Sequence, residues 1–146
     1  MDKKFMQRAI ELAKIAGNEG EVPVGAVIVK NGEIIGEGYN MREQKQNPLS
    51  HAEIEAINNA AKKIGSWRLE DCELYVTLEP CPMCTGAIIN SRIKTVIFGA
   101  YDKNAGSMDS VINLCDYPYN HKVEIYGGIC EDQSKEILQN FFQNLR

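Results

Sequence analysis

Two short clusters of possible metal ligands stand out in the sequence. The first is His51-Ala52-Glu53, and the second is Pro80-Cys81-Pro82-Met83-Cys84. One histidine and two cysteines supply three zinc ligands, and three protein ligands leave a fourth position for water, which distinguishes a catalytic zinc site from a closed structural one. We therefore expect His51, Cys81 and Cys84 to hold one Zn²⁺ ion per subunit.

Glu53 follows His51 by two residues, so its carboxylate can lie beside the metal without binding it. Zinc lowers the pKa of a water that it binds towards neutrality, and such a water can attack an electron-poor ring carbon. The water must lose a proton and the departing amine must gain one, and a carboxylate can carry both protons. We expect Glu53 to be this catalytic acid and base.

Each cluster alone also has an ordinary explanation. A C-x-x-C pair occurs in redox and packing roles as well, and His51-Ala52-Glu53 could be no more than the start of a helix. The other cysteines, Cys72, Cys115 and Cys130, have no partner at ligand spacing, so we expect buried apolar residues or plain thiols. For His121 we expect a surface position or a role in anchoring a loop.

The chain of 146 residues has 44% hydrophobic and 25% charged residues, the balance of one globular domain over residues 1–146. No apolar run approaches the ~20 residues that span a membrane, and residues 1–5 lack the apolar stretch of a signal peptide. We therefore expect a cytoplasmic protein.

The formal net charge of −4 is not typical of a strongly basic nucleic-acid binder. A local basic patch can still bind phosphates. The candidates for such a patch, which could equally be ordinary solvated charges, are Arg42, Arg92, Lys94, Lys103 and Lys122.

The spacing of apolar residues predicts the elements that must position both clusters. Helices are expected over residues 5–16, 51–64, 80–91 and 131–145, and strands over residues 24–29, 33–39, 73–78, 94–98 and 122–126. Asn31-Gly32 predicts a tight hairpin, and Ser50 with Glu53 predicts a capping box. Residues 41–50 and 101–110 are expected to be loops, and residues 111–114 a helical turn. This order predicts an α/β fold, a three-layer α/β/α arrangement around a five-stranded mixed sheet.

With these motifs the chain resembles the cytidine deaminase-like superfamily, whose zinc deaminases carry the signature H-x-E followed by P-C-x-x-C. It is most similar to the bacterial tRNA adenosine deaminases, which convert a wobble adenosine to inosine. The similarity covers residues 23–27, 38–40, 51–54, 74–84, 86–93, 98–102 and 120–124. The segments 98–102 and 120–124 are more specific to the tRNA enzymes than the zinc motif is.

The resemblance implies a homodimer that acts on a tRNA anticodon stem-loop with one Zn²⁺ per subunit. It implies that Asn40 binds the flipped base or its ribose. The backbone around three residues would line the pocket: Ala52, Leu78 and Glu79. Three further residues would contact RNA: Asp102, Lys103 and Phe142.

Two alternatives remain open at this point. The same zinc chemistry could serve a free nucleobase or nucleoside such as guanine or cytosine, although residues 101–121 favour the tRNA enzymes. A zinc-stabilised RNA-binding protein without catalysis is a third possibility. Glu53 argues against it, because a purely structural site needs no acid–base carboxylate and usually has a fourth protein ligand.

Overall fold

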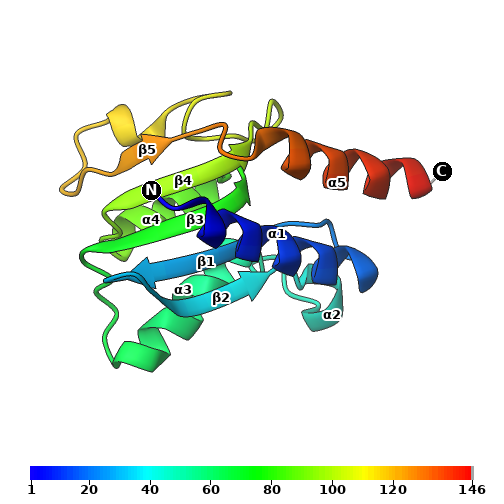
Figure 1. Ribbon diagram of the computed structural model, residues 1–146. Helices are drawn as coiled ribbons and strands as arrows, with labels where there is room; N and C mark the ends of the chain where they lie inside the picture. Colours follow the sequence, from blue (N-terminus) through cyan, green and yellow to red (C-terminus); the bar gives the residue numbers. More distant parts are fainter. Residues whose placement is uncertain (146) are drawn as a thin grey trace.

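The computed structural model describes residues 1–145. These residues form a five-stranded sheet in the order β2-β1-β3-β4-β5 (Figure 1). The strands are β1 Gly25–Lys30, β2 Glu33–Tyr39, β3 Cys72–Leu78, β4 Thr95–Ala100 and β5 Glu124–Tyr126. Strand β1 pairs antiparallel with β2 and β3, whereas β3, β4 and β5 run parallel, so the predicted mixed sheet is confirmed.

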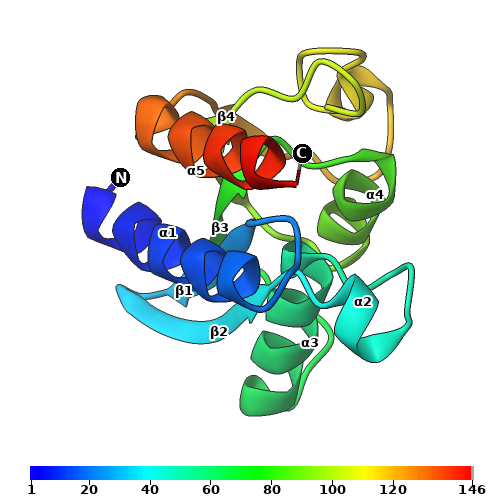
Figure 2. The ribbon, with the colours of Figure 1, turned by 90° about the vertical axis from the view of Figure 1, so that its right-hand side faces the viewer.

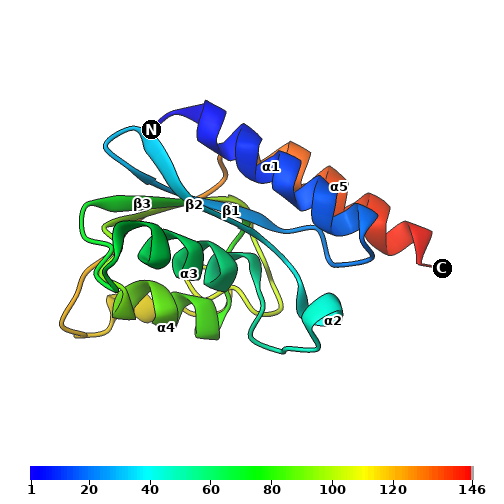
Figure 3. The same ribbon diagram turned by 90° about the horizontal axis from the view of Figure 1, so that it is seen from below.

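Helices cover both faces of the sheet. One face carries α1 (Lys3–Asn18) and α5 (Glu131–Asn144), which lie side by side (Figure 2). The other face carries α3 (Ala52–Ile64) and α4 (Pro82–Asn90), as the view along the sheet shows (Figure 3). The predicted three-layer α/β/α arrangement is therefore confirmed. Within the described residues, no helix is both long enough and apolar enough to span a membrane.

The alternation of side chains along the strands builds a core on each side of the sheet. On β1, Ala26 and Ile28 belong to the cluster under α3 and α4, while Val27 and Val29 belong to the cluster under α1. All four are essentially inaccessible to solvent. Strand β1 is thus buried on both faces, as expected for a strand between two helical layers.

Glycines on β2 let α3 pack directly against the strand backbone. A Cβ at Gly38 would overlap the carbonyl oxygen of Ala52 and the amide nitrogen of Ala56. A Cβ at Gly36 would overlap the backbone of Ala56 and Ala60 in the same way. The first turn of α3 is therefore placed by its close contact with β2.

The hairpin between β1 and β2 turns at Asn31 and Gly32, as predicted. Both residues have positive φ, 52° and 76°, which a two-residue turn of type I′ requires. This turn sets the register of the hairpin, in which Lys30 pairs with Glu33.

Three local predictions were wrong. The expected loop 41–50 contains a short helix, α2 (Arg42–Lys45), because the buried Glu21 carboxylate accepts hydrogen bonds from the backbone amides of Glu43 and Gln44. No capping box forms at Ser50, since α3 begins one residue later and the Ser50 hydroxyl is buried without a hydrogen-bond partner in residues 1–145. The helical turn expected over 111–114 lies at Leu114–Asp116 (η1), where the Asn113 side chain caps the Cys115 amide.

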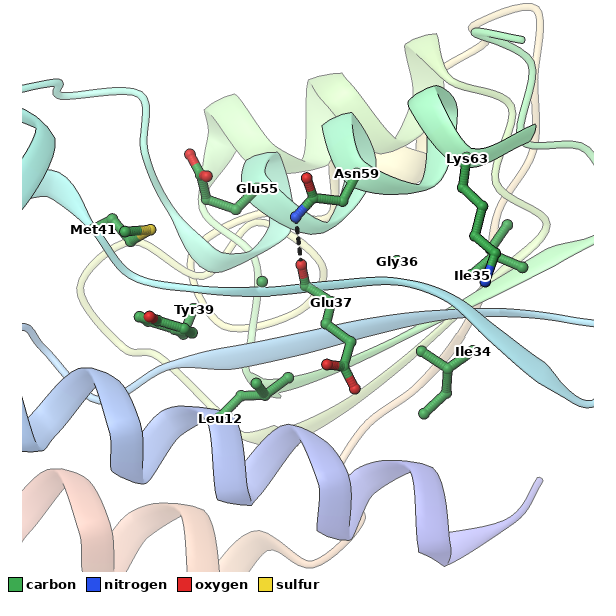
Figure 4. A pocket seen from close by; sticks show the side chains of 11 residues that line it. Leu12, Ile34, Ile35, Gly36, Glu37, Tyr39, Met41, Glu55, Asn59 and Lys63 are labelled. Atoms are coloured by element: carbon green, nitrogen blue, oxygen red, sulfur yellow. Dashed lines mark hydrogen bonds between the residues drawn. The ribbon is translucent and has the colours of Figure 1, made fainter. Parts of the chain in front are cut away.

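The outer edge of the sheet at β2 opens into a groove between α1 and α3 (Figure 4). The Asn59 amide donates a 2.8 Å hydrogen bond to the Glu37 backbone carbonyl across this groove. The Glu37 carboxylate turns towards α1 and pairs with Arg8 at 2.7 Å. The groove is separate from the site described below.

Candidate active site

The two ligand clusters meet because α3 and α4 begin at the same end of the sheet. His51 and Cys81 are the residues immediately before the two helices, and both have extended backbones, with ψ of 158° and 175°. Neither side chain caps its own helix, so each is available to the space between the helix starts. Pro82 at the first position of α4 suits a helix start, where a backbone N–H would lack a partner in any case.

The geometry of His51, Cys81 and Cys84 fits a tetrahedral metal site. Their ligand atoms all lie within 4.8 Å of one another. The His51 Nδ1 atom is 3.6 Å from the Cys81 Sγ atom and 3.5 Å from the Cys84 Sγ atom. With usual Zn–S and Zn–N bond lengths, a tetrahedral angle places such atoms about 3.6 Å apart. The three predicted ligands are therefore brought together at the spacing that a bound ion requires.

The two thiols of the cluster differ in their acidity. The hydrogen bond from Cys84, followed by that from His51, lowers the pKa of the Cys81 thiol to about 4, although burial opposes this shift. The pKa of Cys84 is raised by its hydrogen bond to Cys81 and by burial. One thiol of the pair therefore ionises readily, and the thiolate is the form that binds metals.

Glu53 lies in the first turn of α3, beside the cluster, and its side chain is only 4% exposed. Burial raises the pKa of this carboxyl to about 7, while hydrogen bonding to its own backbone amide and the nearby His51 act in the opposite direction. A group with a pKa near neutrality can both accept and release protons, which is the property of a general acid and base.

These groups face a cavity of about 220 Å³. Its lining includes His51, Glu53 and Cys81, together with four residues expected to contact substrate: Asn40, Leu78, Glu79 and Asp102. The Asn40 Nδ2 atom donates to the Val22 carbonyl at 3.2 Å. Its Oδ1 atom is buried and accepts no hydrogen bond from residues 1–145. Since buried polar atoms are normally paired, this oxygen is available to a donor on a bound molecule.

Three of the expected substrate contacts do not line the cavity. Ala52, the first residue of α3, is fully buried in the core. Lys103 is exposed on the loop that follows Asp102. Phe142 is 49% exposed near the end of α5, where its ring meets that of Phe141 edge-on.

The basic residues proposed as one patch do not gather on one face. Arg42 lines the cavity. Lys94 lines a hollow with Asn31 at the opposite ends of the strands, and Arg92 lies over the Trp67 ring with its Cζ atom 5.6 Å from the ring centre. Arg42 and Lys94 therefore lie in different hollows, and the five basic residues do not all line one of them.

The remaining candidates from the sequence, one histidine and three cysteines, lie in positions that suit a structural role. His121 Nε2 lies 2.6 Å from the Ile93 carbonyl oxygen, so this histidine anchors the segment before β5, as expected. Cys72 is buried in the core, and Cys115 and Cys130 are half-buried free thiols.

For some residues that line the cavity, no pattern in the sequence indicated a place in the site. Val22 and Val24 line the cavity from the segment before β1, and Ala105 lines it from the loop 102–110. The Glu79 carboxylate is bound to the loop 102–110. It accepts hydrogen bonds from the backbone amides of Asp102, Met108, Asp109 and Ser110 and from the Ser110 hydroxyl. These hydrogen bonds hold the pKa of Glu79 below its usual value, although burial acts strongly in the other direction.

Known proteins with the same architecture are deaminases. The family model of the MafB19-like deaminases matches residues 1–146. The tRNA-specific adenosine deaminase of Bacillus subtilis is 47% identical, and the alignment covers 99% of this chain and 91% of that protein. The tRNA-specific adenosine deaminase of Aquifex aeolicus is 48% identical over 97% of this chain and 94% of its own.

A solved structure from studies of A-to-I editing by tRNA:A34 deaminases at the wobble position of transfer RNA superimposes with a TM-score of 0.91. It is 38% identical and covers 94% of this chain and 100% of its own. The fold, the ligand cluster and these similarities agree, and the chain belongs to the MafB19-like deaminase family, within which it groups with the tRNA-specific adenosine deaminases.

Proposed function

We propose that this protein is a zinc-dependent hydrolase that converts the wobble adenosine of a tRNA anticodon loop to inosine. The observation that carries the proposal is the convergence, in one cavity, of the His51–Cys81–Cys84 cluster, the buried carboxylate of Glu53 and the unpartnered oxygen of Asn40. The relatives named tRNA-specific adenosine deaminase supply the substrate class.

The metal suggested by the donor set is zinc. One imidazole nitrogen and two thiolates are typical zinc ligands, and harder ions such as magnesium prefer oxygen. In the proposal His51, Cys81 and Cys84 hold the ion. When bound, zinc supplies a Lewis acid that brings the pKa of water within reach of neutral pH.

Glu53 carries the protons in this scheme. The reaction joins water oxygen to C6 of adenine, breaks the bond from C6 to the amino nitrogen, and releases ammonia. Glu53 takes a proton from the attacking water and delivers a proton to the leaving nitrogen, so the carboxylate is restored at the end of the cycle. Its pKa of about 7 suits both transfers.

Asn40 orients the substrate. Its side-chain nitrogen is held by the Val22 carbonyl, which fixes the amide and leaves the buried Oδ1 atom without a partner in residues 1–145. A carbonyl oxygen held in this way accepts a hydrogen bond from a nucleobase or from a ribose hydroxyl. An adenosine in an anticodon loop is already partly unstacked, which lowers the free energy needed to turn it into such a cavity.

The rest of the anticodon loop would lie on the surface around the cavity mouth. Asp102 lies in the lining, and Lys103 and Arg42 are exposed charged residues next to it. Phe142 offers an exposed aromatic ring on α5, on which a base can stack. We also propose that residues 1–146 act as one domain in the cytoplasm, where the substrate tRNA is found.

A homodimer is part of the proposal. A hollow of about 580 Å³ opens over α4, and its lining is largely apolar: Leu49, Ile54, Met83, Ala87, Ile89, Leu114 and Tyr119. Leu49 and Tyr119 are more than half exposed. Large exposed apolar surfaces of this kind mark interaction sites. Met83 adjoins the ligand Cys84, so a second subunit packed here would lie close to the cavity.

The test is deamination of an adenosine-bearing anticodon stem-loop by the zinc-loaded protein, followed by nucleoside analysis for inosine. Free adenosine, guanine, cytosine and cytidine are assayed in parallel. We expect inosine in the RNA and little change in the free compounds. Ammonia from a free base without inosine in RNA would refute the tRNA assignment and favour a nucleobase deaminase.

The matched variant is Glu53→Gln, which preserves the shape of the side chain and removes its ability to exchange protons. Turnover should fall by about 10²–10⁴-fold, while zinc content and the unfolding midpoint stay close to those of the native protein. Full activity in this variant would exclude the role of Glu53, and a loss of zinc would mean that Glu53 supports the metal instead.

A further inference from the structure

We infer that Glu79 is a positioning residue whose carboxylate holds the loop 102–110 against the cavity and thereby sets the affinity for the RNA substrate. The inference rests on the proposed function and adds to it the residue that controls substrate binding from inside the protein. Glu79 directly follows β3 and lies two residues before Cys81, so it connects the metal cluster to the loop.

The contacts of the Glu79 carboxylate occupy both of its oxygens. Oε1 accepts from the Asp102 amide at 3.1 Å and from the Ser110 hydroxyl. Oε2 accepts from the amides of Met108, Asp109 and Ser110 at 3.1, 2.8 and 2.9 Å. An ionised carboxylate has about four lone-pair sites, so five donors leave no capacity for a substrate or a water.

The full set of hydrogen bonds on Glu79 distinguishes it from Glu53, the other buried carboxylate of the site. Glu53 faces the ligand cluster, whereas the Glu79 oxygens are committed to the loop. Glu79 is therefore excluded as a proton carrier while its hydrogen bonds persist. Its effect on the reaction has to pass through the loop that it holds.

The loop depends on this carboxylate because it contains little regular structure. It lies between β4 and η1. Besides the contacts with Glu79, it is held by the Met108 side chain in the core and by a hydrogen bond from the Ser107 amide to the Pro80 carbonyl at 2.9 Å, while other backbone hydrogen bonds, such as that from the Gly106 amide to the Asp102 carbonyl, stay within the loop. Gly106 packs directly on the carboxylate, where a Cβ would overlap Glu79 Oε1 and Cδ as well as the backbone carbonyl oxygen of Asp102 in the loop itself. The loop is shaped around the Glu79 side chain.

The loop in turn supplies one wall of the cavity. Asp102 and Ala105 line it, and Lys103 is exposed between them. If glutamine replaced Glu79, several amides would compete for a single carbonyl oxygen and the loop would be held less firmly against the cavity. The ligand cluster and Glu53 lie at the starts of α3 and α4 and would stay in position. Substrate binding should therefore weaken more than the chemical step.

Glu79→Gln tests this directly with the zinc-loaded protein and an anticodon stem-loop substrate. We expect KM to rise roughly 10- to 100-fold, the effect of losing one or two hydrogen bonds to a charged group, while kcat changes by less than about threefold. Glu73→Gln, the same chemical change on β3, the strand that precedes Glu79, is the matched control and should leave both constants unchanged. A fall in kcat at constant KM, or a loss of zinc, would overturn the inference.

Gly106→Ala disturbs the contact between the loop and the Glu79 carboxylate by a change in the loop, and Glu79 itself is kept. It should raise KM in the same way, and the double variant Glu79→Gln/Gly106→Ala should be no worse than the more affected single variant. Effects that multiply would show that the two residues act independently and would refute the inference. This variant also replaces Glu79→Gln as the test if Glu79→Gln does not fold.

Hydrogen exchange at the amides of residues 108–110 gives a readout that does not depend on activity. These amides should exchange slowly in the native protein and faster in Glu79→Gln, with α3 and α4 unchanged. Equal exchange in both proteins would overturn the inference. If the native protein forms no inosine, the proposed function fails while the exchange result still decides whether Glu79 holds the loop.

Discussion

Gly38→Ala should damage the site from a position outside it. The new Cβ would overlap backbone atoms of Ala52 and Ala56 in the first turns of α3, and backbone atoms cannot rotate aside. Overpacking of this kind costs roughly 1–3 kcal/mol, and the less flexible unfolded chain returns about 0.4–1 kcal/mol. We therefore expect a net loss of about 1–2 kcal/mol in unfolding free energy.

The loss of activity should be larger than the loss of stability suggests. Relief of the overlap moves the start of α3, which carries Glu53 and directly follows His51. A displacement of about 1 Å at reacting groups can cost roughly 10²-fold in rate. Urea unfolding and single-turnover deamination at saturating RNA measure the two effects on the same preparation.

The matched control is Gly17→Ala in α1, where the added Cβ would make only an ordinary 3.4 Å contact with Pro23. Alanine is favoured over glycine in a helix by roughly 0.5–1 kcal/mol, so this variant should be slightly more stable and fully active. The reasoning about α3 is refuted if Gly38→Ala unfolds within about 0.5 kcal/mol of the native protein and deaminates at the native rate.

Three further predictions concern the metal, the dimer and pH. Cys84→Ser should purify with little zinc while Cys72→Ser retains it, since only the first removes a thiol from the cluster; equal metal content would exclude Cys84 as a ligand. Met83→Glu should give monomers by light scattering, whereas the same change at Ile15, exposed on α1, should not; a native mass for Met83→Glu would argue against the α4 surface. Glu37→Gln should lower the unfolding free energy by about 0.2–1 kcal/mol at pH 7, the range for a partly exposed ion pair. The hydrogen bond from its arginine partner in α1 holds the folded-state pKa of Glu37 below its ordinary 4.5. The difference from the native protein should therefore be complete above pH 4.5 and disappear as the pH falls through the folded-state pKa; a difference that persists in acid would contradict the ion pair.

The parts of the fold that the sequence predicted are those that local physics determines. The helical spacing of apolar residues in α1 and the Asn31-Gly32 turn each need only near neighbours to decide their structure. The short helix α2 escaped prediction because its first amides are satisfied by Glu21, which is more than twenty residues away in the sequence. The capping box at Ser50 failed because α3 begins at Ala52 and His51, not Ser50, is the residue that precedes the helix.

The candidate site also combines residues that the sequence could indicate with contacts that it could not. His51, Cys81, Cys84 and Glu53 could be proposed because their spacing is itself a chemical pattern; the structure clusters the first three and places His51, Cys81 and Glu53 in the lining of one cavity. The orientation of Glu79 was not accessible from the sequence, since it depends on amides contributed by a loop more than twenty residues later in the chain. A sequence motif indicates which chemical groups a reaction needs. The contacts that hold a loop in place depend on the folded structure and are not visible in a motif.

The exposed edge of the sheet at β2 has a consequence for how the protein behaves in a crowded solution. An unprotected edge strand invites strands of other molecules to add to it, which leads to aggregation. Here an added strand would have to displace the Asn59 amide from the Glu37 carbonyl (Figure 4). It would also have to bury the Glu37–Arg8 ion pair. The side chains along β2 therefore keep the sheet from extending between molecules, although no further element covers this edge in residues 1–145.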